Sequence, residues 1–124
     1  MYKRQVLDVG LGTLDERELV PFQAAVDAGA RAVMTSHVVV PALDRERPAT
    51  LSAPVLALLR DRLGFRGVVV SDALDMAGAS ASRGIPEAAV LSVAAGADLL
   101  CVGPDKDAAL VRACLLYTSD AADE

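Results

Sequence analysis

Three nearly continuous apolar runs constrain the fold of this chain more than any other feature of its sequence. They are AVMTSHVVV at residues 32–40, GVVVS at 67–71 and ADLLCV at 97–102. A strand with one face in solvent alternates apolar and polar side chains, whereas a strand covered on both faces reads as a continuous apolar run. The runs therefore predict three strands of a parallel sheet with both faces covered.

A segment with a helical pattern precedes each of these runs. Each begins near a proline or a serine and is followed by a glycine, residue types that favour helix starts and stops. The predicted helices span residues 21–28, 53–63 and 86–95. In the second, Ser52 is the predicted N-cap, and the apolar stripe is Val55, Leu58, Leu59 and Leu63. Helix followed by strand, three times over, predicts an α/β fold built from βα units.

Two shorter helical signals and two long connections complete the pattern. Residues 14–20 suggest one helical turn before the first helix, and Asp105 is a candidate cap for a further helix. The connections at 41–51 and 72–85 follow the carboxyl ends of predicted strands. This is the edge at which α/β folds place their active sites.

The composition excludes several classes of protein. Hydrophobic residues make up 53% of the chain, which argues against disorder, and no apolar run approaches the roughly 20 residues of a membrane-spanning helix. A net charge of −5 with 3% aromatic residues argues against a nucleic-acid surface. Two cysteines, Cys101 and Cys114, are too few for a disulfide framework or a four-ligand zinc site. No cofactor motif occurs, and no metal or cofactor is expected.

Both ends of the chain match a translated sequencing adapter. Residues 114–124 (CLLYTSDAADE) lack the apolar periodicity of the chain before them, and their codons fit a transposon adapter. Residues 1–5 (MYKRQ) fit the same adapter on the opposite strand. A natural disordered tail is the alternative for 114–124. We expect residues 6–113 to be the protein-derived part, and the underlying nucleotide sequence decides between these interpretations.

Two polar residues at predicted strand ends carry most of the chemical information. Asp72 follows the run at 67–71, where a carboxylate needs a hydrogen-bond partner or a substrate. It is a candidate nucleophile or general base, and the alternative is a helix N-cap or a loop salt bridge. His37 interrupts the first run and is a candidate substrate ligand or proton carrier. The alternative is a core histidine bonded to a backbone carbonyl.

The remaining polar residues give weaker signals. Asp75 reads as a solvated or capping residue, and Met76 as a packing residue or the floor of a ligand pocket. Cys101 reads as a small buried hydrophobic residue within a strand. The charged stretch DRER at 44–47 reads as a solvated loop.

Four stretches together resemble one enzyme family. They are LVPFQAAVDAGARAVMTSHVVVPALD, PATLS, LRDRLGFRGVVVSDALDM and EAAVLSVAAGADLLCVGP, and they cover nearly all of residues 6–113. They resemble the N-terminal domain of glycoside hydrolase family 3 and are most similar to its bacterial β-N-acetylhexosaminidases. The pairing of MTSHV and PALD with GVVVSDALDM is more specific than either piece alone.

The resemblance implies a fold, a reaction and site residues. It implies a partial (β/α)8 TIM barrel with about three βα units. It implies retaining hydrolysis of a terminal β-linked N-acetylglucosamine from a glycan or muropeptide, as in peptidoglycan turnover. The aspartate of the family's SD motif is the nucleophile and matches Asp72. The histidine of its MTAH-like motif matches His37, a candidate substrate contact, and Met76 is a second candidate.

One part of the implied machinery has no match in this sequence. The general acid of these hexosaminidases is a histidine in a D-x-H setting on an upstream loop. Residues 6–15 contain no histidine, and the family's KH-containing sugar-binding stretch is also missing. With about three of roughly eight strands present, we expect the 124-residue polypeptide alone to be inactive and to fold poorly, because its strand edges are unpaired.

Two alternative functions remain open from the sequence. A β-glucosidase or other exo-glycosidase of the same family would share the SD aspartate. A non-catalytic flavodoxin-like or receiver-type α/β binding module would also place carboxylates at strand ends. A receiver needs an acidic pair after its first strand and a lysine near its last strand, and this sequence does not arrange them so.

Overall fold

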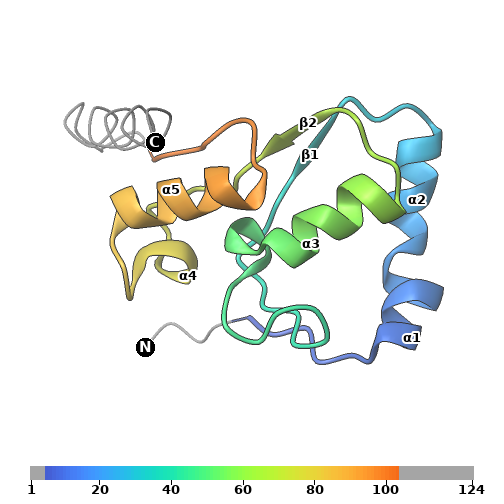
Figure 1. Cartoon of the computed structure of the whole chain (residues 1–124), viewed down its shortest axis with the longest axis horizontal. Coiled ribbons are helices and arrows are strands. Elements are labelled where there is room, and N and C mark those ends of the chain that lie inside the picture. Colours follow the sequence, from blue (N-terminus) through green and yellow to red (C-terminus); the bar gives the residue numbers. More distant parts are fainter. Residues whose placement is uncertain (1–4, 104–124) are drawn as a thin grey trace, which may run out of the picture.

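A parallel pair of strands lies at the centre of the computed structural model, which describes residues 5–103 (Figure 1). β1 (Ala32–Met34) pairs with β2 (Val68–Val70), with Val33 opposite Val69. The predicted parallel pairing is therefore confirmed for the first two runs, but the predicted covering of both faces is not, since Met34 and Val68 are exposed. The expectations for residues 1–4 and 104–124, including the helix capped by Asp105, lie outside the described residues.

The third predicted strand is represented by a single bridge. Val70 forms a parallel bridge with Leu99, and the Ser71 amide donates a hydrogen bond to the Leu99 carbonyl at 2.8 Å. The chain thus runs beside β2 where the strand at 97–102 was predicted, but no regular strand forms there. The spatial order of the three segments follows their order in the sequence, which is typical of consecutive βα units.

The first strand ends at Met34, well short of the predicted residue 40. Beyond it the backbone changes partners: Val39 bridges Val6 in parallel and Pro48 in antiparallel. The Ala49 amide also donates to the Val38 carbonyl at 2.8 Å. The sequence stays apolar here because Val38, Val39 and Val40 remain buried or half-buried. Their backbone hydrogen bonds, however, go to the segments around Val6 and Pro48, which lie outside the sheet.

Two helical segments come before β1. α1 (Leu11–Thr13) continues into the π-helical turn η1 (Leu14–Glu18), and α2 (Val20–Asp27) follows with a proline in its first turn. The predicted helix at 21–28 is therefore confirmed, and the predicted turn at 14–20 lies within these segments. None of the helices in residues 5–103 has the length and apolar character needed to cross a membrane.

The two later predicted helices are also present. α3 (Ala53–Ala57) and the π-helical turn η3 (Leu58–Arg62) fill the second, and α5 (Ile85–Ala95) fills the third. α5 ends at Gly96, whose φ of 114° favours glycine. A short helix that the sequence did not predict, α4 (Ala77–Ser80), lies within the connection at 72–85.

The buried residues of the second helix differ in part from its apolar stripe. Leu59 and Leu63 of the stripe are buried, whereas Val55 and Leu58 are half-buried and Leu56 is buried instead. The reason is tertiary: a Cβ placed on Gly96, at the end of α5, would lie 3.9 Å from Leu56. The end of α5 therefore covers the edge of the helix that carries Leu56.

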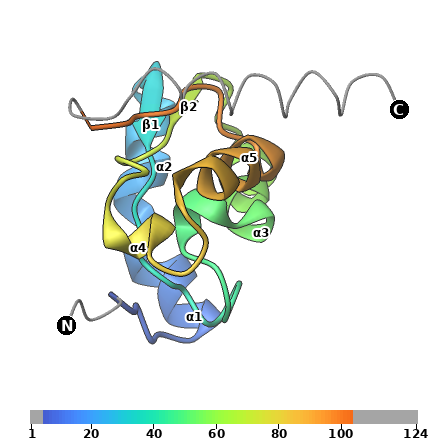
Figure 2. The same ribbon diagram turned by 90° about the vertical axis from the view of Figure 1, so that its left-hand side faces the viewer.

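The apolar core lies between the strands and the helices α3 and α5, which sit together on one side of β1 and β2 (Figure 2). One buried cluster contains Leu56, Leu59, Leu63, Phe65, Val69 and Ala97, and a second contains Leu51, Leu74, Ala79, Ala88 and Ala89. On the opposite strand face, Met34 and Leu99 are 66% and 56% exposed. A closed barrel fills this inner face with side chains from its other strands.

Gly67 provides a test of the packing at the start of β2. A Cβ at this position would meet the Arg31 carbonyl and the Phe65 ring, whereas a Cβ at Gly12 in α1 meets nothing within 4 Å. In a full-length protein carrying this segment, Gly67→Ala is expected to lower the free energy of unfolding by about 1–3 kcal/mol through overpacking. Gly12→Ala is the matched control. Equal urea-unfolding midpoints for the two variants would contradict this packing.

Candidate active site

The carboxyl ends of β1 and β2 bring together the two residues that the sequence singled out. His37 lies just beyond β1 and Asp72 just beyond β2. The Nε2 atom of His37 is 3.9 Å from Oδ2 of Asp72. Parallel pairing accounts for this, because both strands point their carboxyl ends toward the same edge of the sheet.

The Asp72 carboxylate is held at one oxygen. Its Oδ1 accepts a hydrogen bond from the Ala73 amide at 2.8 Å, and the Asp72 amide donates to Thr35 Oγ1 at 3.3 Å. The side chain is 30% exposed, and within residues 5–103 no hydrogen bond engages Oδ2. The N-cap of α4 is Met76, so Asp72 does not cap that helix. One carboxylate oxygen is therefore available to an external group.

The His37 ring is enclosed by protein groups. Its side chain is 4% exposed, with Nε2 2.9 Å from the Ala73 carbonyl and Nδ1 3.0 Å from Thr50 Oγ1. Since a carbonyl oxygen can only accept, Nε2 must carry a hydrogen. The alternative interpretation, a core histidine bonded to a backbone carbonyl, is confirmed. A substrate contact through His37 stays a prediction, one that this geometry does not favour.

Thr50 is the residue that the sequence reasoning missed. It lies in the 3-10 turn η2 (Ala49–Leu51) and is completely buried. Its hydroxyl accepts a hydrogen bond from Thr35 at 2.9 Å and donates one to the Ser36 carbonyl at 2.8 Å. The only sequence signal was its place in the family-like stretch PATLS, because a threonine in a polar connection is otherwise unremarkable.

The other loop candidates lie farther along the same connection. Met76 is 39% exposed, and its predicted contact with substrate stays a prediction. Asp75, predicted as solvated or capping, accepts a hydrogen bond from the Gly103 amide at 2.9 Å. A Cβ on Gly78 would lie 2.7 Å from Cβ of His37, so α4 packs directly against the histidine.

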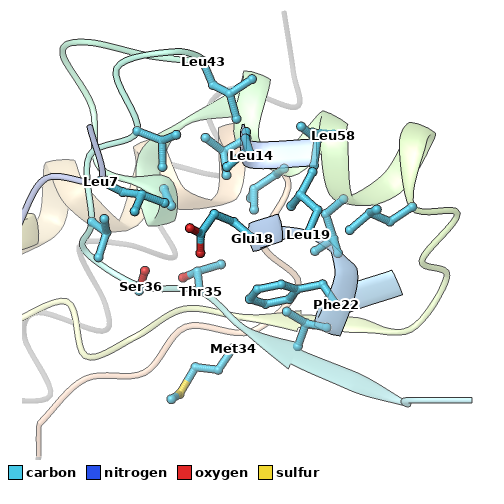
Figure 3. A pocket seen from close by; sticks show the side chains of 18 residues that line it. Leu7, Leu14, Glu18, Leu19, Phe22, Met34, Thr35, Ser36, Leu43 and Leu58 are labelled. Atoms are coloured by element: carbon cyan, nitrogen blue, oxygen red, sulfur yellow. The ribbon is translucent and has the colours of Figure 1, made fainter. Parts of the chain in front are cut away.

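An apolar cavity of about 330 Å³ is lined in part by Thr35 and Ser36 of the same region (Figure 3). It opens between η1, α2, β1 and α3, and aliphatic residues such as Leu14, Leu19 and Leu58 line it. Glu18 is its one charged lining residue, and neither His37 nor Asp72 lines it. This cavity lies between strand and helices, so the candidate site remains the polar strand ends. Within the described residues no cluster of His, Cys, Asp and Glu is arranged to hold a metal.

Comparison with known proteins agrees with this arrangement. A family model described as the glycosyl hydrolase family 3 N-terminal domain matches residues 2–116. The chain belongs to this family.

Individual relatives of this family 3 chain are enzymes. A beta-hexosaminidase of Chromobacterium violaceum is 43% identical over 109 residues, covering 86% of this chain and 30% of the relative. A beta-hexosaminidase of Xylella fastidiosa (strain M23) is 44% identical over 93 residues, covering 74% of this chain and 28% of the relative. The chain thus spans about 30% of the length of the curated relatives it matches.

Solved structures give the same fold. A family 3 beta-N-acetylglucosaminidase from Paenibacillus is 39% identical with a TM-score of 0.85, covering 98% of this chain and 24% of that one. The beta-N-acetylglucosaminidase from Thermotoga maritima is 28% identical with a TM-score of 0.87, and the match covers 98% of this chain and 28% of that one. The expected fold is therefore confirmed: an α/β chain of parallel βα units that forms part of a TIM barrel.

A second aspartate fixes the loop that carries Thr50. Oδ1 of Asp44 accepts hydrogen bonds from the Glu46 and Arg47 amides at 2.9 and 3.0 Å, and Oδ2 accepts one from the Ser52 hydroxyl at 2.9 Å. Ser52 is the N-cap of α3 by position, but its hydroxyl makes no capping bond. Desolvation raises the pKa of Asp44, yet these hydrogen bonds and the charge of Arg47 outweigh it and hold the pKa below 3.8.

Asp44 gives this family 3 loop a defined pH dependence. Because the pKa of Asp44 is lowered in the folded state, its stabilising contribution is present above pH 3.8 and is lost as the pH falls below that value. Asp44→Asn is expected to lower the free energy of unfolding at pH 7 by about 1 kcal/mol, discounted for solvent screening. Unfolding titrations from pH 7 to pH 3 should show the two proteins converging. A constant difference over that range would contradict this role.

Proposed function

We propose that this chain is part of a retaining β-N-acetylhexosaminidase in which Asp72 is the nucleophile. The observation that carries the proposal is the position of Asp72 at the carboxyl end of β2, half-buried, with Oδ1 held by the Ala73 amide and no hydrogen bond to Oδ2 from the described residues. The relatives at 40–44% identity are hexosaminidases, which supports the amino-sugar assignment. The implied substrate is an N-acetylglucosamine-containing glycan or muropeptide.

The geometry suits a two-step displacement. In the first step Oδ2 of Asp72 bonds to the anomeric carbon, the glycosidic bond breaks, and a general acid protonates the departing oxygen. The hydrogen bond from Ala73 fixes the carboxylate orientation, so the open oxygen can approach a carbon that develops positive charge. In the second step water attacks the same carbon from the face opposite Asp72 and gives a proton to the conjugate base of the general acid, the bond to Oδ2 breaks, and the sugar leaves with its configuration retained.

Asp72→Asn in a full-length protein with this segment tests the assignment. The variant is expected to lower kcat on an aryl N-acetyl-β-glucosaminide by more than about 10³-fold, because no carboxylate remains to bond the sugar. Asp61→Asn, an exposed carboxylate in η3, is the matched control and should leave kcat unchanged. The enzyme treated with a slow fluorosugar should carry the label on Asp72 in peptide mass spectrometry. A label on any other residue would overturn the assignment.

The same assays separate the amino-sugar enzyme from its family alternative. Aryl β-glucosides and β-xylosides are compared with the N-acetylglucosaminide on the unaltered enzyme. Preference for a plain glucoside would assign the chain to the β-glucosidase alternative while leaving Asp72 as nucleophile.

The histidine that the family resemblance implies as general acid is not supplied by this chain. His37 is the single histidine of the sequence, and its ring nitrogens are bonded to Ala73 and Thr50. A group so enclosed cannot reach the departing oxygen and deliver a proton there. The 124-residue polypeptide by itself is therefore expected to release no aryl alcohol above the uncatalysed rate. Cleavage abolished by Asp72→Asn in the isolated polypeptide would show that the acid lies within it.

A further inference from the structure

The Thr50 hydroxyl has no part in the chemistry of the proposed reaction, yet it is the centre of a buried polar network. Thr50 is completely buried, and its Oγ1 lies within hydrogen-bond distance of three groups. They are Thr35 Oγ1 at 2.9 Å, the Ser36 carbonyl at 2.8 Å and His37 Nδ1 at 3.0 Å. Burying so many polar groups costs free energy unless all of them are satisfied together.

Two arms of this network reach the backbone of the nucleophile loop. Through the first arm, Thr35 accepts a hydrogen bond from the Asp72 amide at 3.3 Å. Through the second arm, Nε2 of His37 contacts the Ala73 carbonyl at 2.9 Å. The two arms fix both ends of the short stretch from the Asp72 amide to the Ala73 carbonyl. The Ala73 amide in between is the group that orients the Asp72 carboxylate.

The network is anchored in the core rather than in the exposed loop. The Thr50 amide donates to the Ser36 carbonyl at 3.1 Å, which ties η2 to the stretch after β1. The next residue, Leu51, is completely buried in a cluster with Leu74 and Ala88. Thr50 therefore has a fixed position from which its hydroxyl can hold the two arms.

Hydrogen positions make Thr50 the point where both arms meet. Thr35 Oγ1 accepts from Asp72, so its own hydrogen is directed to Thr50. With its hydrogen on Nε2, the His37 ring presents Nδ1 to the Thr50 hydroxyl, whose single hydrogen then faces two acceptors, Nδ1 of His37 and the Ser36 carbonyl. Removal of this one oxygen leaves the hydrogen of the Thr35 hydroxyl without an acceptor and Nδ1 of His37 without a partner, and the Ser36 carbonyl keeps only the Thr50 amide.

We propose that Thr50 is a positioning residue that fixes the Asp72 nucleophile through Thr35 and His37. The inference rests on the proposed function of Asp72 and extends it to three residues that the chemistry itself does not use. In this arrangement His37 acts on the Ala73 carbonyl and makes no contact with the sugar. A displacement of a catalytic group by about 1 Å can lower a rate by about 100-fold, so loss of the Thr50 hydroxyl should reduce the rate far more than substrate binding.

A pair of near-isosteric variants in the full-length enzyme tests the proposal. Thr50→Val removes the hydroxyl and keeps the branched shape, whereas Thr50→Ser keeps the hydroxyl. Thr50→Val is expected to lower kcat and the rate of fluorosugar labelling of Asp72 by about 10- to 100-fold, with KM changed less than about threefold. Thr50→Ser is expected to restore both rates to within about threefold of the unaltered enzyme. Ser92→Ala removes another buried hydroxyl, one without a partner in the described structure, and should leave the rates unchanged.

The outcomes separate this proposal from the assignment of Asp72. An inactive Asp72→Asn variant together with a folded Thr50→Val variant of unimpaired kcat would overturn the positioning role and leave the nucleophile in place. An active Asp72→Asn variant would overturn the proposed function itself. Equal losses in Thr50→Val and Thr50→Ser would show that shape, and not the hydroxyl, is what the site needs.

A second variant and a measurement on the unaltered enzyme keep the test decisive if Thr50→Val does not fold. Thr35→Val removes the acceptor of the Asp72 amide and is expected to lower kcat in the same way, with Thr35→Ser as its control. In ¹⁵N-histidine spectra of the enzyme, assigned by the signal lost in His37→Gln, His37 is expected to carry a hydrogen on Nε2. A neutral ring with its hydrogen on Nδ1 alone would overturn the network.

Discussion

Parallel pairing of β1 with β2 is the constraint on which the candidate site depends. Residues far apart in the sequence meet because both strands deliver their carboxyl ends to one edge, with Val33 opposite Val69. One step beyond this register, the Thr35 amide donates to the Val70 carbonyl at 2.8 Å. Nε2 of His37 and Oδ2 of Asp72 are then 3.9 Å apart, although the two residues are distant in the sequence.

The aspartates of this chain differ in how completely their oxygens are bonded. The carboxylate of Asp44 is bonded at both oxygens. Oδ2 of Asp98 accepts from the Val69 amide and from Arg60, both at 2.7 Å. The hydrogen bond from Val69, followed by that from Arg60, lowers the pKa of Asp98 despite its desolvation. Both carboxylates bind other segments of the chain, Asp44 through Ser52 and Asp98 through Val69 and Arg60, whereas the Asp72 carboxylate accepts only from the amide of the next residue, Ala73.

Sequence reasoning located the elements and the two strand-end residues because both follow from local patterns. Apolar runs and glycine stops predicted where β2 and α5 lie. The same reasoning extended the first strand to residue 40, because burial of a side chain does not reveal which segment bonds its backbone. It also assigned the Ser52 hydroxyl to a helix cap, although that hydroxyl bonds Asp44 across the loop. Partners of this kind are set by tertiary packing.

The sequence by itself determined the α/β class, the family and the position of Asp72 at the end of a buried strand. The class and the position of Asp72 rest on spacing and residue type, and the family rests on the resemblance of four stretches; all of these are properties of the chain before it folds. Only the tertiary structure decided what surrounds Asp72: the buried Thr50 hydroxyl, the enclosed His37 ring and the single carboxylate oxygen left open. The physical reason is that hydrogen bonds act over about 3 Å, and only the folded chain brings η2 and the ends of β1 and β2 within that distance.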